Sequence, residues 1–165
     1  ATTGTIRVFG KQIGKEVDFP ERLGVIIEAP GFLTNLTGIR NLEILADMRR
    51  QITKADARIA MRKVGLDPDM RKPVAKYSLG MRQRLAIAQA IMEDPHILIL
   101  DEPMNGLDKQ SVAKVREILL ELKAEGKTIL LTSHNKEDIE ILCDEVYEME
   151  RGRIVGSCLS SCIVT

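Results

Sequence analysis

A pair of acidic residues directly follows a run of branched aliphatic residues in the stretch ILILDEP, residues 97–103. The run Ile97–Leu100 predicts a buried strand, but the carboxylates of Asp101 and Glu102 are costly to bury unless a partner binds them. A metal ion is a frequent partner for carboxylates. We therefore expect a cation and its substrate at this strand end. The alternative is a strand that simply ends in acidic residues where it meets water.

A second candidate lies upstream, in the stretch KYSLGMRQRLAIAQAI, residues 76–91. Ser78 and Gly80 predict the entry of a helix, because serine is a favoured N-cap residue. The first turn of a helix presents unsatisfied N–H groups and the positive end of the helix dipole, which together suit a phosphate. The stretch is therefore consistent with a phosphate contact, and equally with an ordinary capped helix.

A third candidate is His134, which ends the apolar stretch TILLTSH, residues 128–134. A single histidine is more often a structural or surface residue than a catalytic one. In α/β proteins, however, ligands gather at the carboxyl ends of the strands, and histidine changes its charge near neutral pH. Its place at a strand end makes His134 a candidate for the same site as the acidic pair.

The elements that must position these residues alternate between strand and helix patterns. Short β-rich runs occupy residues 5–9 and 23–27, and a block of two or three helices follows, in which Ile59, Met61 and Val64 recur at helical spacing. The second half of the chain predicts a helix ended by Pro95, a buried strand, a helix over 111–125, a strand over 128–134, a short helix over 135–143 and a hairpin turning at Arg151–Gly152. This alternation predicts the α/β class with a helical insertion.

The composition narrows the function classes. The chain has 165 residues, of which 44% are hydrophobic, and this suits one domain with a sizeable core. Lys plus Arg and Asp plus Glu both number 24, so no net charge recruits nucleic acid or anionic lipid. The three cysteines predict no disulfide framework, and no apolar run approaches a membrane span in length. We expect a cytoplasmic protein without a nucleic-acid partner.

Together these stretches resemble the motifs of the ATP-binding-cassette (ABC) ATPases, in that family's order. YSLGM is similar to the signature motif usually written LSGGQ, ILILDE to Walker B, and NGLD at residues 105–108 to the D-loop, while His134 corresponds to the switch histidine. The resemblance extends from Gly4 to about Gly156. It implies an α/β fold with a partial P-loop NTPase (RecA-like) core, residues 1–29 and 93–165, and an inserted helical subdomain with the signature motif, residues 30–92.

The resemblance implies catalytic roles for one group of residues, with ATP and Mg²⁺ as cofactors. Asp101 would hold Mg²⁺, and Glu102 would orient and polarise the attacking water. His134 would be the second catalytic residue. Glu28 stands at the Q-loop position in place of glutamine and keeps an oxygen for the Mg²⁺ and water network. These four residues would act on one face of the nucleotide.

The resemblance also implies partners. ATP would lie between two such domains arranged head to tail, with Ser78 and Gly80 reaching the γ-phosphate bound by the other domain. Asp108, in the D-loop, would lie at the dimer interface. A membrane-spanning transporter subunit would hold the protein at the inner face of the cell membrane.

The sequence also departs from the family pattern. Leu79 and Met81 replace a glycine and the glutamine of the signature, and the 165 residues contain no G-x-x-x-x-G-K-[ST] phosphate loop, or Walker A motif. The nearest match, Gly126-Lys127-Thr128, follows a helix and precedes a strand, whereas a phosphate loop requires the opposite order. We therefore expect an N-terminally truncated cassette that is inactive by itself.

The stretch GVIIEAPGFLTNLTGIRNLEIL, residues 24–45, is most similar to the ATPases of bacterial peptide-antibiotic and bacteriocin exporters of the bacitracin-transport type. The leading hypothesis is therefore the ATP-hydrolysing subunit of an ABC exporter. Two alternatives remain. One is an ABC ATPase that does not serve transport, although the interval from Glu28 to Ser78 is too short for a long coiled coil. The other is a non-catalytic cassette that acts only as an interaction module.

Overall fold

The computed structural model describes residues 3–27 and 31–159, with the side chains of residues 158 and 159 excepted. Glu28 and Cys162 lie outside these residues. The elements follow in the order β1 (Arg7–Val8), β2 (Lys11–Gln12), β3 (Leu23–Ile26), α1 (Gly38–Arg49), α2 (Lys54–Lys63), the 3₁₀ helix η1 (Val74–Lys76), α3 (Leu79–Ile91), β4 (Ile97–Asp101), α4 (Lys109–Ala124), β5 (Thr128–Thr132), α5 (Lys136–Leu142), β6 (Glu145–Glu150) and β7 (Arg153–Leu159). The predicted alternation of strands and helices is confirmed.

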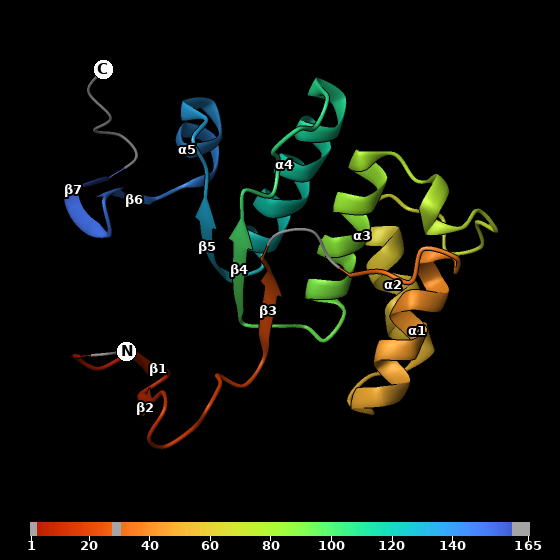
Figure 1. Ribbon diagram of the computed structural model, residues 1–165, viewed down its shortest axis with the longest axis horizontal. Helices are drawn as coiled ribbons and strands as arrows, with labels where there is room; N and C mark the ends of the chain where they lie inside the picture. The colour runs from red at the N-terminus through yellow and green to blue at the C-terminus, as the bar shows by residue number, and fades with distance from the viewer. Residues whose placement is uncertain (1–2, 28–30, 160–165) are drawn as a thin grey trace.

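A parallel sheet of three strands, in the order β3-β4-β5, forms the centre of the molecule (Figure 1). In the view of Figure 1, the helices α1, α2 and α3 lie to the right of β3, and the β6–β7 hairpin lies to the left of β5. The register pairs Ile97 with Leu23 and with Thr128, and at the far end it pairs Asp101 with Thr132. Because the strands are parallel, the carboxyl ends of β4 and β5 meet at the same edge of the sheet.

One face of the sheet is covered by helices. Leu98 and Leu100 of β4 are 0% and 1% exposed, and they belong to one hydrophobic core with residues of α3 and α4. Helix α3 comes very close to β3 at Gly24, where a Cβ atom would lie 2.3 Å from the carbonyl oxygen of Ala90. A glycine is therefore required at residue 24 for this helix to pack on the sheet.

The other face of the sheet is open. Val25 of β3 and Leu130 of β5 are aligned through Ile99 of β4, and they are 38% and 60% exposed. Side chains alternate between the faces of a strand, so Asp101 and Thr132, two residues beyond Ile99 and Leu130, also belong to this open face. The open face is apolar in its middle and polar at its carboxyl edge.

The predicted helical block is present as α1, α2 and α3, with the short η1 before α3. Thr37 caps α1, and Thr53 forms a reciprocal capping box with Asp56 at the start of α2. Met61 and Val64 are buried, but Ile59, which was grouped with them by its helical spacing, is 58% exposed. The buried face of α2 is instead made by Ala57, Ala60 and Met61.

Two other predictions about local structure differ in outcome. The hairpin β6–β7 turns at Arg151 and Gly152, as predicted, and both residues have positive φ, at 48° and 77°. The β-rich run at residues 5–9 forms only the short strand β1, because the chain turns back at Phe9 and Gly10 to pair with β2. No helix in the described parts of the chain is long and apolar enough to cross a membrane.

Candidate functional site

The carboxyl ends of β4 and β5 bring three polar groups together. Asp101 is paired in register with Thr132, whose hydroxyl donates a hydrogen bond of 2.6 Å to Asp101 Oδ1. The same hydroxyl oxygen accepts a hydrogen bond of 2.9 Å from the backbone N–H of Glu102. The first residue after β4 is therefore fixed to the last residue of β5.

Glu102 turns out of the strand and faces His134. Its φ of 44° lies in the left-handed region, which residues other than glycine seldom adopt. His134 Nδ1 lies 3.0 Å from each of the two carboxylate oxygens of Glu102. The Glu102 side chain is 34% exposed and that of His134 is 74% exposed. Both groups therefore remain accessible to water and to a ligand.

The electrostatics of this pair favour the charged imidazole. The hydrogen bond that Glu102 accepts from His134 raises the pKa of His134 above its ordinary value, and the negative charge of the same carboxylate adds to this effect. Asp138 makes a smaller contribution in the same direction. The imidazole therefore orients a carboxylate that is still 34% exposed.

A buried ion pair supports the loop that carries His134. Asp138 is 2% exposed and accepts a hydrogen bond of 2.7 Å from Arg116 Nε of α4. Ser133 donates to the other Asp138 oxygen over 3.3 Å, and the Ser133 hydroxyl accepts the backbone N–H of Asn135 over 3.1 Å. Both residues that flank His134 are thus connected to the core of the protein through Asp138.

Sequence reasoning did not identify this ion pair, although the chain carries a signal for it. Asp138 lies four residues before Leu142, on the same face of α5, and both are buried. An acidic residue at a buried helical position requires a cation. The spacing could therefore have predicted a basic partner for Asp138, but not that Arg116 supplies it.

The site fits a cation that arrives together with a substrate. Within residues 3–27 and 31–159, no group of three or more His, Cys, Asp or Glu residues could hold a metal ion. Mg²⁺ does not need such a cage, because it is commonly bound by one or two carboxylates together with substrate phosphates and water. Asp101 supplies one such carboxylate, with Oδ1 engaged by Thr132 and Oδ2 in no hydrogen bond to the described residues. The donor set therefore fits Mg²⁺ bound with a nucleotide.

The helix entry predicted at Ser78 is present. Ser78 caps α3, and its hydroxyl accepts the backbone N–H of Met81 over 3.2 Å. Gly80 is buried against α4, where a Cβ atom would lie 2.3 Å from Ser111 Oγ. This contact gives residue 80 a structural reason to be glycine, one that the motif alone did not reveal.

Asp108 caps the neighbouring helix α4. Its carboxylate accepts the backbone N–H of Ser111 over 2.8 Å, and this hydrogen bond lowers the pKa of Asp108 below its ordinary value. Because Ser111 also packs against Gly80, the first turns of α3 and α4 lie side by side. Ser78, Gly80 and Asp108 thus form a second group of candidate residues.

The structure brings some of the candidates together and leaves others apart. Asp101, Glu102 and His134 share the carboxyl edge of the sheet, whereas the second group surrounds the starts of α3 and α4. Among the described residues, no hydrogen bond or ion pair joins the two groups.

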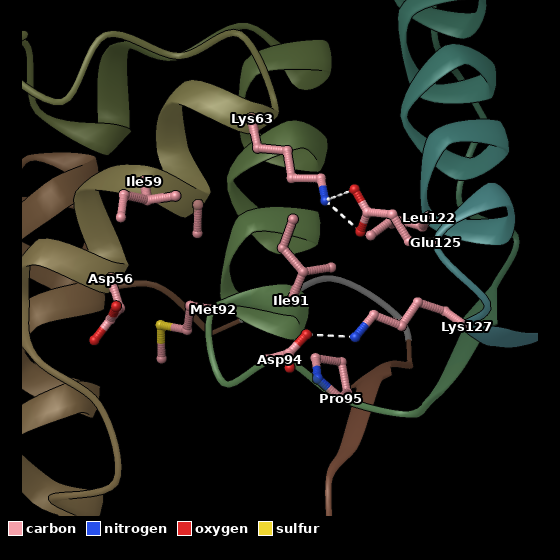
Figure 2. Close-up of a pocket in the computed structure, with 11 residues that line it drawn as sticks. Asp56, Ile59, Lys63, Ile91, Met92, Asp94, Pro95, Leu122, Glu125 and Lys127 are labelled. Atoms are coloured by element: carbon pink, nitrogen blue, oxygen red, sulfur yellow. Dashed lines mark hydrogen bonds and ion pairs between the residues drawn. The ribbon is translucent and has the colours of Figure 1, made fainter.

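A pocket of about 210 Å³ lies at the opposite, amino-terminal ends of the strands, between α2, α3 and α4. Its floor is apolar, with Ile91 and Leu122, and two ion pairs close its rim (Figure 2). One joins Lys63 to Glu125 over 2.7 Å, and the other joins Lys127 to Asp94. Because its lysines are already paired and the site carboxylates lie elsewhere, this pocket does not contribute to the candidate site.

Comparison with known proteins identifies the family of this chain. The model of the family described as "ABC transporter" matches residues 1–105. The chain is 45% identical over 156 residues to the ABC transporter ATP-binding protein YybJ of Bacillus subtilis, with 94% of this chain and 72% of YybJ covered. It is 44% identical over 156 residues to the bacitracin transport ATP-binding protein BcrA of Enterococcus faecalis, with 93% of this chain but only 51% of BcrA covered.

Among solved structures, the dimeric ATP-binding cassette MJ0796 in a post-hydrolysis state with ADP and Pi has a TM-score of 0.81. The match covers 96% of this chain and 74% of that chain at 18% identity, and it confirms the P-loop NTPase fold. The family match over residues 1–105 and the identity to YybJ confirm the family that the sequence resembles. The chain belongs to the ABC transporter family, in the branch formed by its ATP-binding proteins.

Proposed function

We propose that this chain is part of the ATP-hydrolysing subunit of an ABC exporter, which works through a separate membrane subunit. The observation that carries the proposal is the contact of Glu102 with His134 at the end of β4, beside Asp101. The name of BcrA, a bacitracin transport protein, supports an exporter of antibiotic peptides. Because the chain spans about half of BcrA, the activity and the substrate of the whole protein are part of the proposal.

The proposed roles of the residues come from the family resemblance, and the positions of their atoms support them. Glu102 accepts the proton of the attacking water, and His134 holds the Glu102 carboxylate in place. Asp101 would provide an oxygen ligand for Mg²⁺, which would neutralise charge on the β- and γ-phosphates when bound. Glu28, in the Q-loop, would add an oxygen to this network, and it lies outside the described residues. ATP and Mg²⁺ are thus the cofactors that we propose.

A second copy of the domain would complete the site. Ser78 caps a helix of thirteen residues whose first turn has the polarity that suits a phosphate. Ser78 and Leu79 are exposed at this point, so another molecule could approach them. We propose that Ser78 and Gly80 contact the γ-phosphate of the facing domain in a head-to-tail dimer, with Asp108 at the interface.

The remaining assignments concern the arrangement of the whole transporter. We propose that residues 30–92 act as the helical subdomain and that residues 1–29 and 93–165 belong to the core. A membrane subunit would place the protein on the cytoplasmic side of the membrane. A non-catalytic interaction module is the second candidate function, because no phosphate loop occurs within the 165 residues.

The test uses a longer protein that carries a phosphate loop ahead of these residues. Glu102→Gln keeps the shape of the side chain but removes the base, so turnover of ATP should fall by about 10²- to 10⁴-fold while ATP binding persists. The matched control is Glu121→Gln on the exposed surface of α4, which should leave turnover unchanged. Turnover of Glu102→Gln within twofold of the parent protein would refute the proposed role of Glu102.

A further inference from the structure

Thr132 makes two hydrogen bonds with the end of β4, and none of the roles assigned above includes it. It is the last residue of β5 and is paired in register with Asp101. The hydroxyl donates to Asp101 Oδ1 over 2.6 Å and accepts the backbone N–H of Glu102 over 2.9 Å. A hydroxyl has one donor hydrogen and two acceptor lone pairs, so both bonds form at the same time.

The bond to Glu102 acts at a strained point of the backbone. Glu102 has a φ of 44°, a conformation that side-chain-bearing residues adopt only when their surroundings impose it. Its N–H is fixed by Thr132, and its side chain is fixed by His134, two residues further along the same segment. The segment 132–134 therefore holds Glu102 at both its backbone and its carboxylate.

The bond to Asp101 selects one oxygen of that carboxylate. Oδ1 is occupied by the Thr132 hydroxyl, so a cation approaching Asp101 would meet Oδ2. Valine has nearly the same shape as threonine but neither donates nor accepts. With valine at residue 132, both the Asp101 oxygen and the Glu102 N–H would lose their partner.

We propose that Thr132 is a positioning residue of this site, whose single hydroxyl fixes Asp101 for the cation and Glu102 for the attacking water. We call the two hydrogen bonds of the Thr132 hydroxyl, to Asp101 and from Glu102, the Thr132 bridge. The catalytic part of this inference rests on the proposed function, but the existence of the bridge does not. Thr132 would act through its two neighbours and would not touch the reacting atoms.

The first experiment measures the bridge in the 165-residue chain. Amide hydrogen exchange at Glu102, followed by NMR, should speed up about five- to tenfold in Thr132→Val, the change expected for the loss of one hydrogen bond. Thr132→Ser keeps the hydroxyl and should remain within twofold of the parent. Thr128→Val makes the same change at the exposed first residue of β5 and should have no effect at Glu102. Unchanged exchange in Thr132→Val, or equal acceleration in Thr132→Ser, would overturn the inference.

The second experiment measures turnover in the longer protein with a phosphate loop. Thr132→Val should lower kcat on the order of tenfold with little change in KM, because the bridge orients groups that act in the transition state. Thr132→Ser should restore kcat, and Thr128→Val should match the parent. If Glu102→Gln lowers kcat and Thr132→Val does not, the positioning role is wrong. If neither lowers it, the proposed function fails, and the exchange data still decide whether the bridge exists.

Discussion

The two faces of the central sheet are built from the same strands and from similar aliphatic residues, but they have different surroundings. On the covered face, Leu98 and Leu100 are almost completely buried beneath α3 and α4. On the open face, Val25 and Leu130 are 38% and 60% exposed. The alternation of side chains in β4 thus divides the strand between two tasks. Its covered side chains stabilise the fold. Its open side ends at Asp101, next to Glu102 and His134.

The largest expected effect is a difference in stability between variants of the covered face and variants of the open face. Leu98→Ala should lower the free energy of unfolding by about 2–5 kcal/mol, because it leaves a cavity in the packed core. Leu130→Ala is the matched change on the open face, and it should cost about 0.5 kcal/mol or less, since Leu130 is 60% exposed. Urea denaturation of the 165-residue chain would measure both. Equal losses would show that the open face is also covered in solution.

The next effect concerns the ion pair that connects the covered interior to the loop of His134. Asp138→Ala should lower the free energy of unfolding by about 3 kcal/mol, because the largely buried Arg116 side chain loses the more buried of its two carboxylate partners. Glu137→Ala removes the exposed partner of the same arginine and should cost about 0.5 kcal/mol. The same denaturation experiment measures both variants. A loss in Glu137→Ala as large as that in Asp138→Ala would show that burial does not distinguish the two carboxylates.

The smallest expected effect is a titration at the polar edge of the open face. Glu102 raises the pKa of His134, so this pair stabilises the folded protein at pH values below the ordinary histidine pKa. The stabilisation should be lost as pH rises from about 6.5 through the raised value. NMR titration of the His134 ring should show the raised pKa in the parent and a lower pKa in Glu102→Gln. The pKa in Glu121→Gln should equal that of the parent.

Equal His134 pKa values in the parent protein and in Glu102→Gln would count against the Glu102–His134 contact. In the same pH range, the difference in unfolding free energy between the two proteins should shrink with rising pH. A difference that grows with pH would have the wrong sign for a histidine whose pKa is raised on folding.

The features that could be predicted from the sequence are those set by local pattern. The run Ile97–Leu100 predicted β4, the helical pattern over residues 111–125 predicted α4, and the Arg151–Gly152 turn predicted the last hairpin. Each depends on residues close together in the chain. Each motif that indicated the family is likewise a short stretch of neighbouring residues.

The features that could not be predicted depend on pairing between distant segments. The bridge from Thr132 to Asp101 requires the parallel register of β4 and β5, which no local pattern specifies. The packing of Gly80 against Ser111 requires the approach of two helices. Ile59 has the spacing of a core residue, yet α2 turns its alanine-rich face to the core, and only the tertiary packing decides between these faces.

The central claim is that Glu102 and His134 form one catalytic unit at the polar edge of the open face, and a double-mutant cycle tests it most directly. Turnover of ATP would be measured in the longer protein with a phosphate loop, for Glu102→Gln, His134→Ala and both together. If the histidine acts by holding the carboxylate, the double variant should lie within about threefold of Glu102→Gln alone, because residues that act as a unit are non-additive. Single effects that multiply fully in the double variant would contradict the claim and show that the two residues act independently.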